Sequence, residues 1–375
     1  MSRLFLFGTL RWAALRADIA GRDLPVRPAR LPGHAVLRSV EGDWPVLVAG
    51  TGADGDLTDP LDAEALDRLD FYEASFGYTR RDVLVQCDGA AVEALVYDAP
   101  AQGAGAWDLS DWTARHGTRT RIAAQEILRA AGRETPDDLR ARMGWLQARA
   151  ESIAQAGLRG RPASLAPAFG RDDVQVARVD YPYEGFHRVE EWHFDHPRFD
   201  GTRSGPIKRA VSTVTDAATM LPYDPARDLV LLVEQIRAGM LAKGDLNPWT
   251  TEPPAGLIDA GETAETAALR ELREEAGLEV TADALRLVAR YYPSPGGLAQ
   301  MLHSYIAITE LSEDMSGTAG LAEEGEDIRT HVIPFEKLMD MVASGEAANG
   351  PLILSAQWIA LNRDALRLER GQGDV

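Results

Sequence analysis

The sequence predicts two domains that each combine helices and strands, in the α/β class taken broadly enough to include α+β folds. Its 375 residues suffice for two domains with separate cores. Segments with the periodicity of strands and of helices alternate along the chain. Residues 158–170 contain prolines and glycines without any periodicity, as linkers do. We therefore expect a first domain over 1–115, a helical connector and linker over 116–172, and a second domain over 173–375.

Composition and charge exclude several classes of function. The formal net charge is −19, whereas proteins that bind nucleic acids usually carry a basic face. No apolar run is long enough to cross a bilayer, and the opening residues 1–10 are too short, with no cleavage site, for a signal peptide. The single cysteine, Cys87, rules out an internal disulfide and fits a reducing compartment. We expect a cytoplasmic protein that acts on a small molecule and binds neither nucleic acid nor membrane.

The first hundred residues predict a small mixed domain. Residues 4–7 have the composition of a buried strand that enters a tight turn at Gly8, where backbone amides can receive an anion. A strand near 45–49 and a helix over 62–70 follow. Two further strands, 78–86 and 91–97, are joined by Asp88-Gly89, a typical hairpin turn.

Two helices are expected next, over 119–133 and 135–156. Thr135 is placed to cap the second helix, with Pro136 at its first position. Apolar residues recur on one face of that helix, which must pack against another element. They are Leu139, Met143, Leu146, Ala150 and Ile153.

The second domain begins with strands. Residues 188–195 alternate in polarity, which predicts an antiparallel strand with one wet face. His187, His193 and His196 could suggest a metal site, but no cysteine or second histidine pair accompanies them, so we interpret them as facing solvent. Strands are then expected over 210–220 and 229–237, on either side of a turn at 222–225.

Residues 256–278 form a glycine loop followed by an acidic helix. Helical spacing places Glu271 and Glu275 on one face with Glu274 beside them, and like charges at this spacing destabilise a helix. A divalent cation between the carboxylates would relieve their repulsion. Oxygen ligands on so short a span suit Mg²⁺, or alternatively Mn²⁺.

This span resembles the Nudix box, G-x5-E-x7-R-E-U-x-E-E-x-G-U with U an aliphatic residue, at every fixed position. The resemblance implies an α/β/α sandwich with a mixed sheet and two or more metal ions. It assigns metal binding to Glu271, Glu274 and Glu275. It also implies that Glu262 pairs with Arg270, and that Gly277 ends the helix in the left-handed conformation.

Four segments outside the box resemble the ADP-ribose pyrophosphatase branch of that family. They are 221–225 with 233–237, 254–256, 294–297 and 320–328. The resemblance implies that Arg237 offers its guanidinium to a phosphate. It implies that the Ala255 carbonyl is a further metal ligand, and that Pro295 lies in a substrate-binding segment. In the branch, a glutamate of the last segment completes the metal cluster or acts as the base; Glu326 matches best and Glu324 second.

One position departs from this branch. After residues 294–297 the family commonly has a glutamate that contacts substrate, and the corresponding position here is Gln300, which lacks the charge. Arg209 is a further candidate contact for phosphate or adenine.

The first domain resembles the gamma-glutamylcyclotransferase family, in its AIG2-like branch, a small barrel-like mixed fold. The similarity rests on Phe7-Gly8-Thr9-Leu10 and on residues 69–73 followed by 78–80. It implies that the turn at Gly8, Thr9 and Leu10 holds the substrate's carboxylate while Glu73 shuttles a proton. Such a glutamate needs a raised pKa, which Phe71, Tyr72 and Phe76 would supply. Phe7 replaces the family's usual tyrosine, and both an active domain and an inactive or regulatory one stay open.

The sequence therefore predicts Mg²⁺-dependent hydrolysis of ADP-ribose to AMP and ribose 5-phosphate. By resemblance we expect a homodimer through the second domain, with residues 187–200 at the contact. Three alternatives stay open: dominant cyclotransferase activity through Glu73, a preference for another sugar nucleotide, which Gln300 favours, and non-catalytic sensing of ADP-ribose. The fusion of these two halves also resembles proteins associated with tellurite resistance, a phenotype that carries no mechanism.

Overall fold

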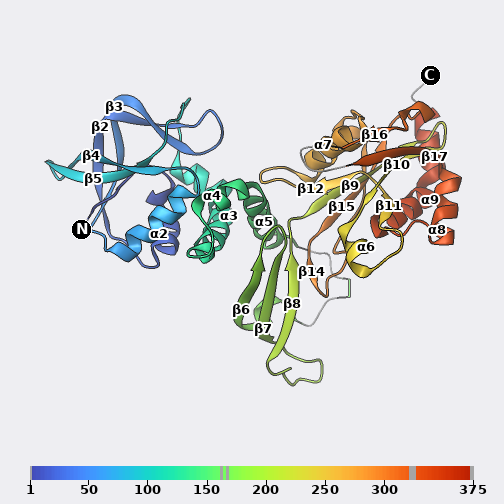
Figure 1. Cartoon of the computed structure of the whole chain (residues 1–375), viewed down its shortest axis with the longest axis horizontal. Helices are drawn as coiled ribbons and strands as arrows, with labels where there is room; N and C mark the ends of the chain where they lie inside the picture. The colour runs from blue at the N-terminus through green and yellow to red at the C-terminus, as the bar shows by residue number, and fades with distance from the viewer. Residues whose placement is uncertain (1, 161–163, 166–168, 321–326, 372–375) are drawn as a thin grey trace. The chain divides into compact units, whose positions relative to one another are not determined.

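The computed structural model describes residues 2–160, 164–165, 169–320 and 327–371. The chain divides into two compact units, Met1–Arg159 and Gly160–Val375 (Figure 1). The first unit contains β1 (Phe5–Leu6), η1 (Thr9–Arg11), α1 (Ala13–Ala20), β2 (Val26–Arg38), β3 (Pro45–Thr58), α2 (Ala63–Ala74), β4 (Thr79–Cys87), β5 (Ala90–Asp98), α3 (Leu109–Ala130), α4 (Pro136–Ala141) and α5 (Met143–Ala156).

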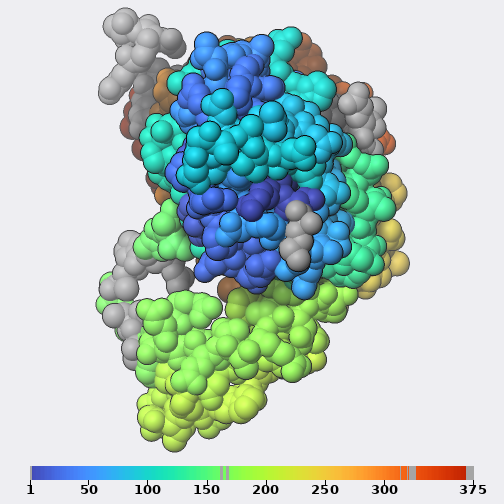
Figure 2. Space-filling view, turned by 90° about the vertical axis from the view of Figure 1, so that its left-hand side faces the viewer, coloured from blue at the N-terminus to red at the C-terminus, as the bar shows by residue number. Residues whose placement is uncertain are grey.

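The sheet of the first unit has the order β1-β3-β2-β4-β5, with antiparallel ladders. Its two edges approach each other, because Leu4 forms a parallel bridge with Leu95 and the Leu95 amide donates to the Arg3 carbonyl at 2.8 Å. The sheet is therefore curled like a barrel but is not closed by a continuous ladder. Asp88 and Gly89 have φ angles of 50° and 77°, which confirms the predicted hairpin turn. The strands of this hairpin, coloured cyan, reach the surface in Figure 2.

The helices expected in the connector pack into the core of the first unit. Trp112 and Ile127 of α3, with Leu139 and Leu146, are buried in one cluster together with Leu69 of α2. The predicted apolar stripe is thus buried where it contains Leu139, Leu146 and Ala150. A second cluster lies against the sheet and contains Phe5, Leu31, Leu57, Val85 and Val96.

Two helix boundaries differ from the prediction. Helix α3 begins at Leu109, well before 119, because Asp108 caps it by accepting from the Asp111 amide at 2.9 Å. The helix expected over 135–156 is two helices, since Arg142 leaves the helical conformation at φ −113° and ψ 14°. Thr135 caps α4 and Pro136 occupies its first position, as predicted.

The second unit contains the remaining elements. They are η2 (Arg171–Asp173), β6 (Gln175–Glu184), β7 (Arg188–Asp195), β8 (Ile207–Thr213), β9 (Ala217–Asp224), β10 (Leu229–Ile236), α6 (Ala238–Lys243), β11 (Trp249–Glu252), β12 (Ala255–Leu257), α7 (Ala264–Ala276), η3 (Ala282–Ala284), β13 (Leu285–Tyr291), β14 (Leu298–Ala299), β15 (Leu302–Ile308), η4 (Glu313–Met315), β16 (Thr318–Ala319), β17 (Ile328–Pro334), α8 (Phe335–Ser344) and α9 (Gly350–Gly371).

The main sheet of the second unit is mixed and lies between two helical layers. Its order is β13-β15-β9-β10-β17-β16, with β11 and β12 as side branches, and β9 runs parallel to β15. Along β10, Leu231 lies in one buried cluster with Leu272 of α7, whereas Leu232 lies in another with Leu338 of α8 and Leu352 of α9. Alternate residues therefore face opposite layers, which confirms the α/β/α sandwich.

A second sheet has the order β14-β8-β7-β6 and lies apart from the main sheet in Figure 1. The prediction of one strand over 210–220 is wrong, because this stretch contains parts of two strands, β8 and β9, that belong to different sheets. The chain changes sheet at 214–216, where Asp216 accepts from the Met301 amide at 3.0 Å. The turn expected at 222–225 lies later, because β9 continues to Asp224.

None of the helices in the described parts of the chain is long and apolar enough to cross a membrane.

The buried ion pair between α3 and α5 generates a stability prediction. The side chains of Arg149 and Glu126 are 1% and 2% exposed, and Arg149 Nη2 lies 2.5 Å from Glu126 Oε1. Replacing Glu126 with leucine leaves a buried guanidinium without its main partner, so we expect a loss of about 3–5 kcal/mol in the opening free energy of α3, measured by hydrogen exchange. As a control, Arg27→Gln breaks an exposed pair with Asp88 and should cost less than about 1 kcal/mol. Equal protection in Glu126→Leu and the parent protein would contradict this.

Candidate functional site

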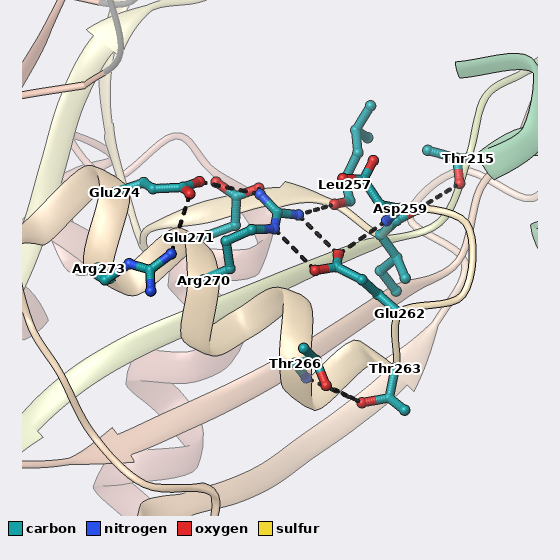
Figure 3. A network of polar contacts seen from close by, with 11 residues as sticks. Thr215, Leu257, Asp259, Glu262, Thr263, Thr266, Arg270, Glu271, Arg273 and Glu274 are labelled. Carbon is teal, nitrogen blue, oxygen red and sulfur yellow. Dashed lines mark hydrogen bonds and ion pairs between the residues drawn. The ribbon is translucent and has the colours of Figure 1, made fainter. Parts of the chain in front are cut away.

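Helix α7 presents the acidic residues of the predicted box. The Thr263 hydroxyl caps its start by accepting from the Thr266 amide at 3.1 Å (Figure 3). Gly277 ends the helix with φ 63° and ψ 19°, as predicted. Ala267, Ala268 and Leu272 are buried against the main sheet. Because Glu271 and Glu275 flank this apolar face, packing of the helix directs their carboxylates toward the adjoining strands.

Arg270 connects the glycine loop to the acidic helix. Its Nε and Nη2 donate to the two carboxylate oxygens of Glu262 at 3.1 and 3.0 Å, which confirms the predicted pair, and Nη2 also donates to the Leu257 carbonyl (Figure 3). Its Nη1 donates to Glu271 at 2.6 Å and to Glu274 at 3.2 Å. The hydrogen bonds to Glu262 raise the pKa of Arg270. Burial opposes ionisation of Glu262, but the bonds from Arg270 keep its pKa below the ordinary value.

Glu275 is the most deeply buried carboxylate of the helix, with 1% exposure. Its Oε2 accepts from the Ala255 amide at 2.8 Å, and Gln235 Nε2 lies 3.4 Å from its Oε1. Strand β12 pairs with β9 so that the Pro254 carbonyl accepts from Met220 of β9 and the Ile258 amide donates to Asp216, directly before β9. The Leu257 carbonyl instead accepts from Arg270 of α7. Carbonyl groups two residues apart on a strand point the same way, so the Ala255 carbonyl, like that of Leu257, points away from β9.

Gly256 brings the backbone of β12 against Glu271. A Cβ atom added at Gly256 would lie inside the contact distance of the Glu271 carboxylate, so no larger residue fits without moving it. The carboxylates of Glu271 and Glu275 therefore meet the backbone at Ala255–Gly256 from the same helix. This set offers oxygen donors only, which is the donor chemistry of hard divalent cations.

Arg237 is paired with a buried carboxylate that the sequence analysis missed. Its Nε donates to Glu252 Oε1 at 2.7 Å, and Asn349 Nδ2 donates to Glu252 Oε2 at 3.0 Å. Burial raises the pKa of Glu252, although the nearby Arg237 opposes this. The only feature of the sequence that could have indicated Glu252 is its position directly before Pro253-Pro254.

Three predicted substrate contacts lie on or beside the second sheet. Arg209 is an exposed residue of β8, and its Nη1 donates to the Lys208 carbonyl at 2.8 Å. Gln300 follows β14, and its Nε2 donates to the Thr215 carbonyl at 2.9 Å. Pro295 is exposed, within a turn that Gly297 N closes onto Ser294 O at 3.1 Å. The candidate bases Glu324 and Glu326 lie outside the described residues.

The histidines of the second sheet are less exposed than predicted. His187 is exposed, but His193 and His196 are half-buried. His193 Nε2 lies 2.9 Å from Asp180, and these two with Glu191 are close enough to hold a metal. Arg178 and Lys208 already donate to Asp180 and Glu191, so we interpret the group as an ion-pair cluster. Arg188 and Glu190 form a buried pair on β7, so the buried side of this strand is partly charged.

The first unit has a partly open cavity of about 530 Å³ that is lined by the predicted cyclotransferase residues. Gly8, Thr9, Leu10 and Glu73 all line it. Gly8 is needed there because an added Cβ would lie 2.6 Å from Pro45 Cγ. The structure therefore brings together two segments that are far apart in the sequence.

Glu73 is 9% exposed, and burial raises its pKa to about 8. Within residues 2–160 its carboxyl group has no hydrogen-bond or ion-pair partner. Tyr78, whose pKa burial and Glu73 together raise to about 12, also lines the cavity. The apolar environment expected around Glu73 is thus present, with Tyr72 and Phe76 among the lining residues.

Family models match a segment of each unit. The family model NUDIX domain matches residues 213–354, and the model Gamma-glutamyl cyclotransferase, AIG2-like matches residues 4–114. The chain belongs to the Nudix family, the class of hydrolases to which the glycine loop, acidic helix and mixed sheet correspond.

Similar proteins of known name indicate the branch of the Nudix family to which the second unit belongs. The ADP-ribose pyrophosphatase of Escherichia coli (strain K12) is 37% identical over 210 residues, which cover 56% of this chain and 98% of that protein. That of Haemophilus influenzae is 35% identical, over 52% of this chain and 89% of that protein. A GDP-mannose pyrophosphatase of Shigella dysenteriae is 32% identical, over 41% and 78%. These relatives put the second unit in the ADP-ribose pyrophosphatase branch.

A solved structure titled "Crystal structure of ADP compounds hydrolase" aligns at 20% identity with a TM-score of 0.38, over 54% of this chain and 97% of that chain.

The contact between Gly256 and Glu271 generates a prediction for metal affinity. Gly256→Ala pushes the Glu271 carboxylate from its position, so we expect Mn²⁺ affinity to fall by about 10–100-fold in isothermal titration. Gly239→Ala is a matched control, because an added Cβ at Gly239 meets no atom within 4 Å. Unchanged affinity in Gly256→Ala would show that Glu271 is not a ligand.

The raised pKa of Glu73 generates a prediction for stability. Between its ordinary value of 4.5 and its value of about 8, the folded state binds a proton that the unfolded state lacks, so this group lowers stability as pH rises through that window. Glu73→Gln removes the effect, and the variant should gain stability relative to the parent by up to about 1.4 kcal/mol per pH unit. Urea unfolding from pH 5 to 8 measures this, with exposed Glu93→Gln as the control. A constant difference across that range would contradict the burial of an ionisable Glu73.

Proposed function

We propose that the second unit hydrolyses ADP-ribose to AMP and ribose 5-phosphate. The observation that carries the proposal is the meeting of Glu271 and Glu275 with the backbone at Ala255–Gly256. The named relatives support ADP-ribose as the substrate. We further propose Mg²⁺ as the ion, with Mn²⁺ as a substitute, and two or more ions in the site.

The residues of the chain have distinct parts in this proposal. Glu271, Glu275 and the Ala255 carbonyl hold the ions, and the Ala255 amide orients Glu275. Bound divalent ions would lower the pKa of a water molecule and offset the charge of the diphosphate. Arg270 keeps Glu271 and Glu274 in place through hydrogen bonds from Nη1.

Substrate binding and proton transfer are assigned to residues around this centre. Arg237 is held by Glu252 but its side chain is 43% exposed, so it can still offer donors to a phosphate. Gln300, Pro295 and Arg209 are proposed substrate contacts on the side of the second sheet. From the sequence resemblance, Glu326, or else Glu324, takes the proton of the attacking water, and Glu274 assists.

We also propose that the protein is a cytoplasmic homodimer with residues 187–200 at the contact. The β6 and β7 strands form one side of the second sheet, where Tyr183 and Phe186 are exposed by 59% and 40%. Sedimentation of the intact protein at micromolar concentration would test this, and a monomer would refute it.

The test of the hydrolase proposal is AMP release from ADP-ribose with Mg²⁺. Glu275→Gln removes a charged ligand, so we expect it to lower the rate by about a hundredfold or more. Glu73→Gln is the matched control and should keep the parent rate, because Glu73 lies in the other unit. Binding of ADP-ribose without AMP release by the intact protein would refute hydrolysis in favour of sensing. Comparison with GDP-mannose tests for another preferred sugar nucleotide.

A second proposal concerns the first unit, where a buried Glu73 with a pKa of about 8 lines a partly open cavity. We propose that it is a cyclotransferase for γ-glutamyl amides. The substrate's α-amine attacks its own side-chain carbonyl, a ring C–N bond forms, and the amide C–N bond breaks. Glu73 takes a proton from the attacking nitrogen and returns it to the leaving amine, which releases 5-oxoproline.

This activity should not depend on metal. We expect 5-oxoproline release from a γ-glutamyl amide to continue in EDTA, to persist in Glu275→Gln, and to fall by about 10²–10⁴-fold in Glu73→Gln, the range typical of a lost proton-transfer group. Chromatographic measurement of 5-oxoproline gives the rates. Absence of release by the parent protein would leave the first unit as a binding or regulatory domain.

A further inference from the structure

Helices α3 and α5 supply one wall of the cavity that contains Glu73. The match to the cyclotransferase family ends at residue 114, whereas α3 continues to Ala130 and α5 spans Met143–Ala156. The cavity residues beyond the match come from these two helices. They are Arg119, Thr120, Ala123, Gln147 and Ala150. This chain therefore closes the cavity with side chains that the family similarity does not account for.

This wall is held firmly against the rest of the unit. The buried pair of Arg149 and Glu126 joins α5 to α3. On another side of the cavity, Asp43 accepts from His116 Nε2 at 2.6 Å and from Arg115 Nη1 at 2.7 Å, and both donors belong to α3. Asp43 itself lines the cavity, so α3 also positions the loop between β2 and β3.

Arg119 is the one positively charged side chain among the described residues that line the cavity. It is 21% exposed, and its Nη1 donates to Glu151 Oε2 at 3.0 Å. Glu151 also accepts from Gln155 Nε2 at 2.8 Å, so its charge is shared. A guanidinium has five N–H donors, and this ion pair orients the fork while using only one of them.

The other ionisable residues that line the cavity are all acidic, so an anion would bind at Arg119. The charge of Asp43 is offset by Arg115, burial raises the pKa of Glu73 to about 8 so that its neutral form predominates at pH 7, and Glu41 is exposed. A volume of about 530 Å³ lies in the range that holds whole small molecules, so there is space beyond a γ-glutamyl group.

We propose that Arg119 determines specificity by binding a carboxylate on the amine half of the substrate. The cavity then takes γ-glutamyl amides whose amine is itself an amino acid or short peptide, in preference to simple alkylamides. The inference rests on the proposed cyclotransferase function of Glu73. Gln147, on the same wall, offers a neutral donor and acceptor to the cavity.

The experiment compares two probes, γ-glutamylglycine and γ-glutamylethylamide, which differ by the carboxylate. Their dissociation constants are measured by calorimetry on Glu73→Gln, and their turnover by 5-oxoproline release on the parent. Arg119→Gln should weaken binding of γ-glutamylglycine by about tenfold or more, whereas binding of γ-glutamylethylamide should change less than about twofold. In turnover the same variant should raise KM for γ-glutamylglycine and leave kcat nearly unchanged.

Glu151→Gln is the matched control, because it breaks the same ion pair but keeps the guanidinium. If Arg119 only ties α3 to α5, Glu151→Gln and Arg119→Gln should affect both probes alike, and that result would overturn the inference. The inference is also overturned if Arg119→Gln leaves the affinity for both probes unchanged, or if neither probe binds. Selective binding that depends on Arg119, without any 5-oxoproline release, would support the inference and refute the cyclotransferase proposal.

Discussion

The close approach of strand β12 to helix α7 is the contact on which the second unit's chemistry depends. Gly256 has no side chain, so the strand can lie directly against the Glu271 carboxylate, and the neighbouring Ala255 amide donates to the buried Glu275 at 2.8 Å. Arg270 then ties the glycine loop to the same helix. The Ala255 amide and the Arg270 guanidinium thereby hold the carboxylates of Glu271, Glu274 and Glu275 in place. These donors reduce the electrostatic cost of placing like charges close together.

The two units use buried carboxylates in opposite ways. In the second unit, Glu262 and Glu275 accept strong hydrogen bonds, and bonds from Arg270 keep the pKa of Glu262 low. In the first unit, burial alone raises the pKa of Glu73 to about 8. Donors that favour the ionised form suit a carboxylate that must stay charged, as Glu262 does in its pair with Arg270, whereas an apolar cavity suits a group that must gain and lose a proton near neutral pH. The two sites therefore need no shared residues.

Local signals in the sequence predicted local structure well. Thr135 and Pro136 start α4, Asp88-Gly89 forms the hairpin turn, and Gly277 ends α7, because each depends on neighbours within a few residues. The prediction failed at residues 210–220, where one apolar run crosses between two sheets. It also missed Glu252 as the partner of Arg237, because the two lie fifteen positions apart, Glu252 on β11 and Arg237 directly after the strand β10 that pairs with it. Periodicity carries no information about which distant segments meet.

The sequence by itself determined the class of the second unit, since the spacing of the Nudix box specifies both a helix and the face that carries its carboxylates. It also determined that Glu73 lies among apolar residues, because these are its neighbours along the chain. Only the tertiary structure decided that α3 and α5 wall the Glu73 cavity, that Arg119 faces it, and that Glu252 holds Arg237. Those relations join segments separated by many residues, and they follow from which apolar faces are buried together, a property of the whole packed chain.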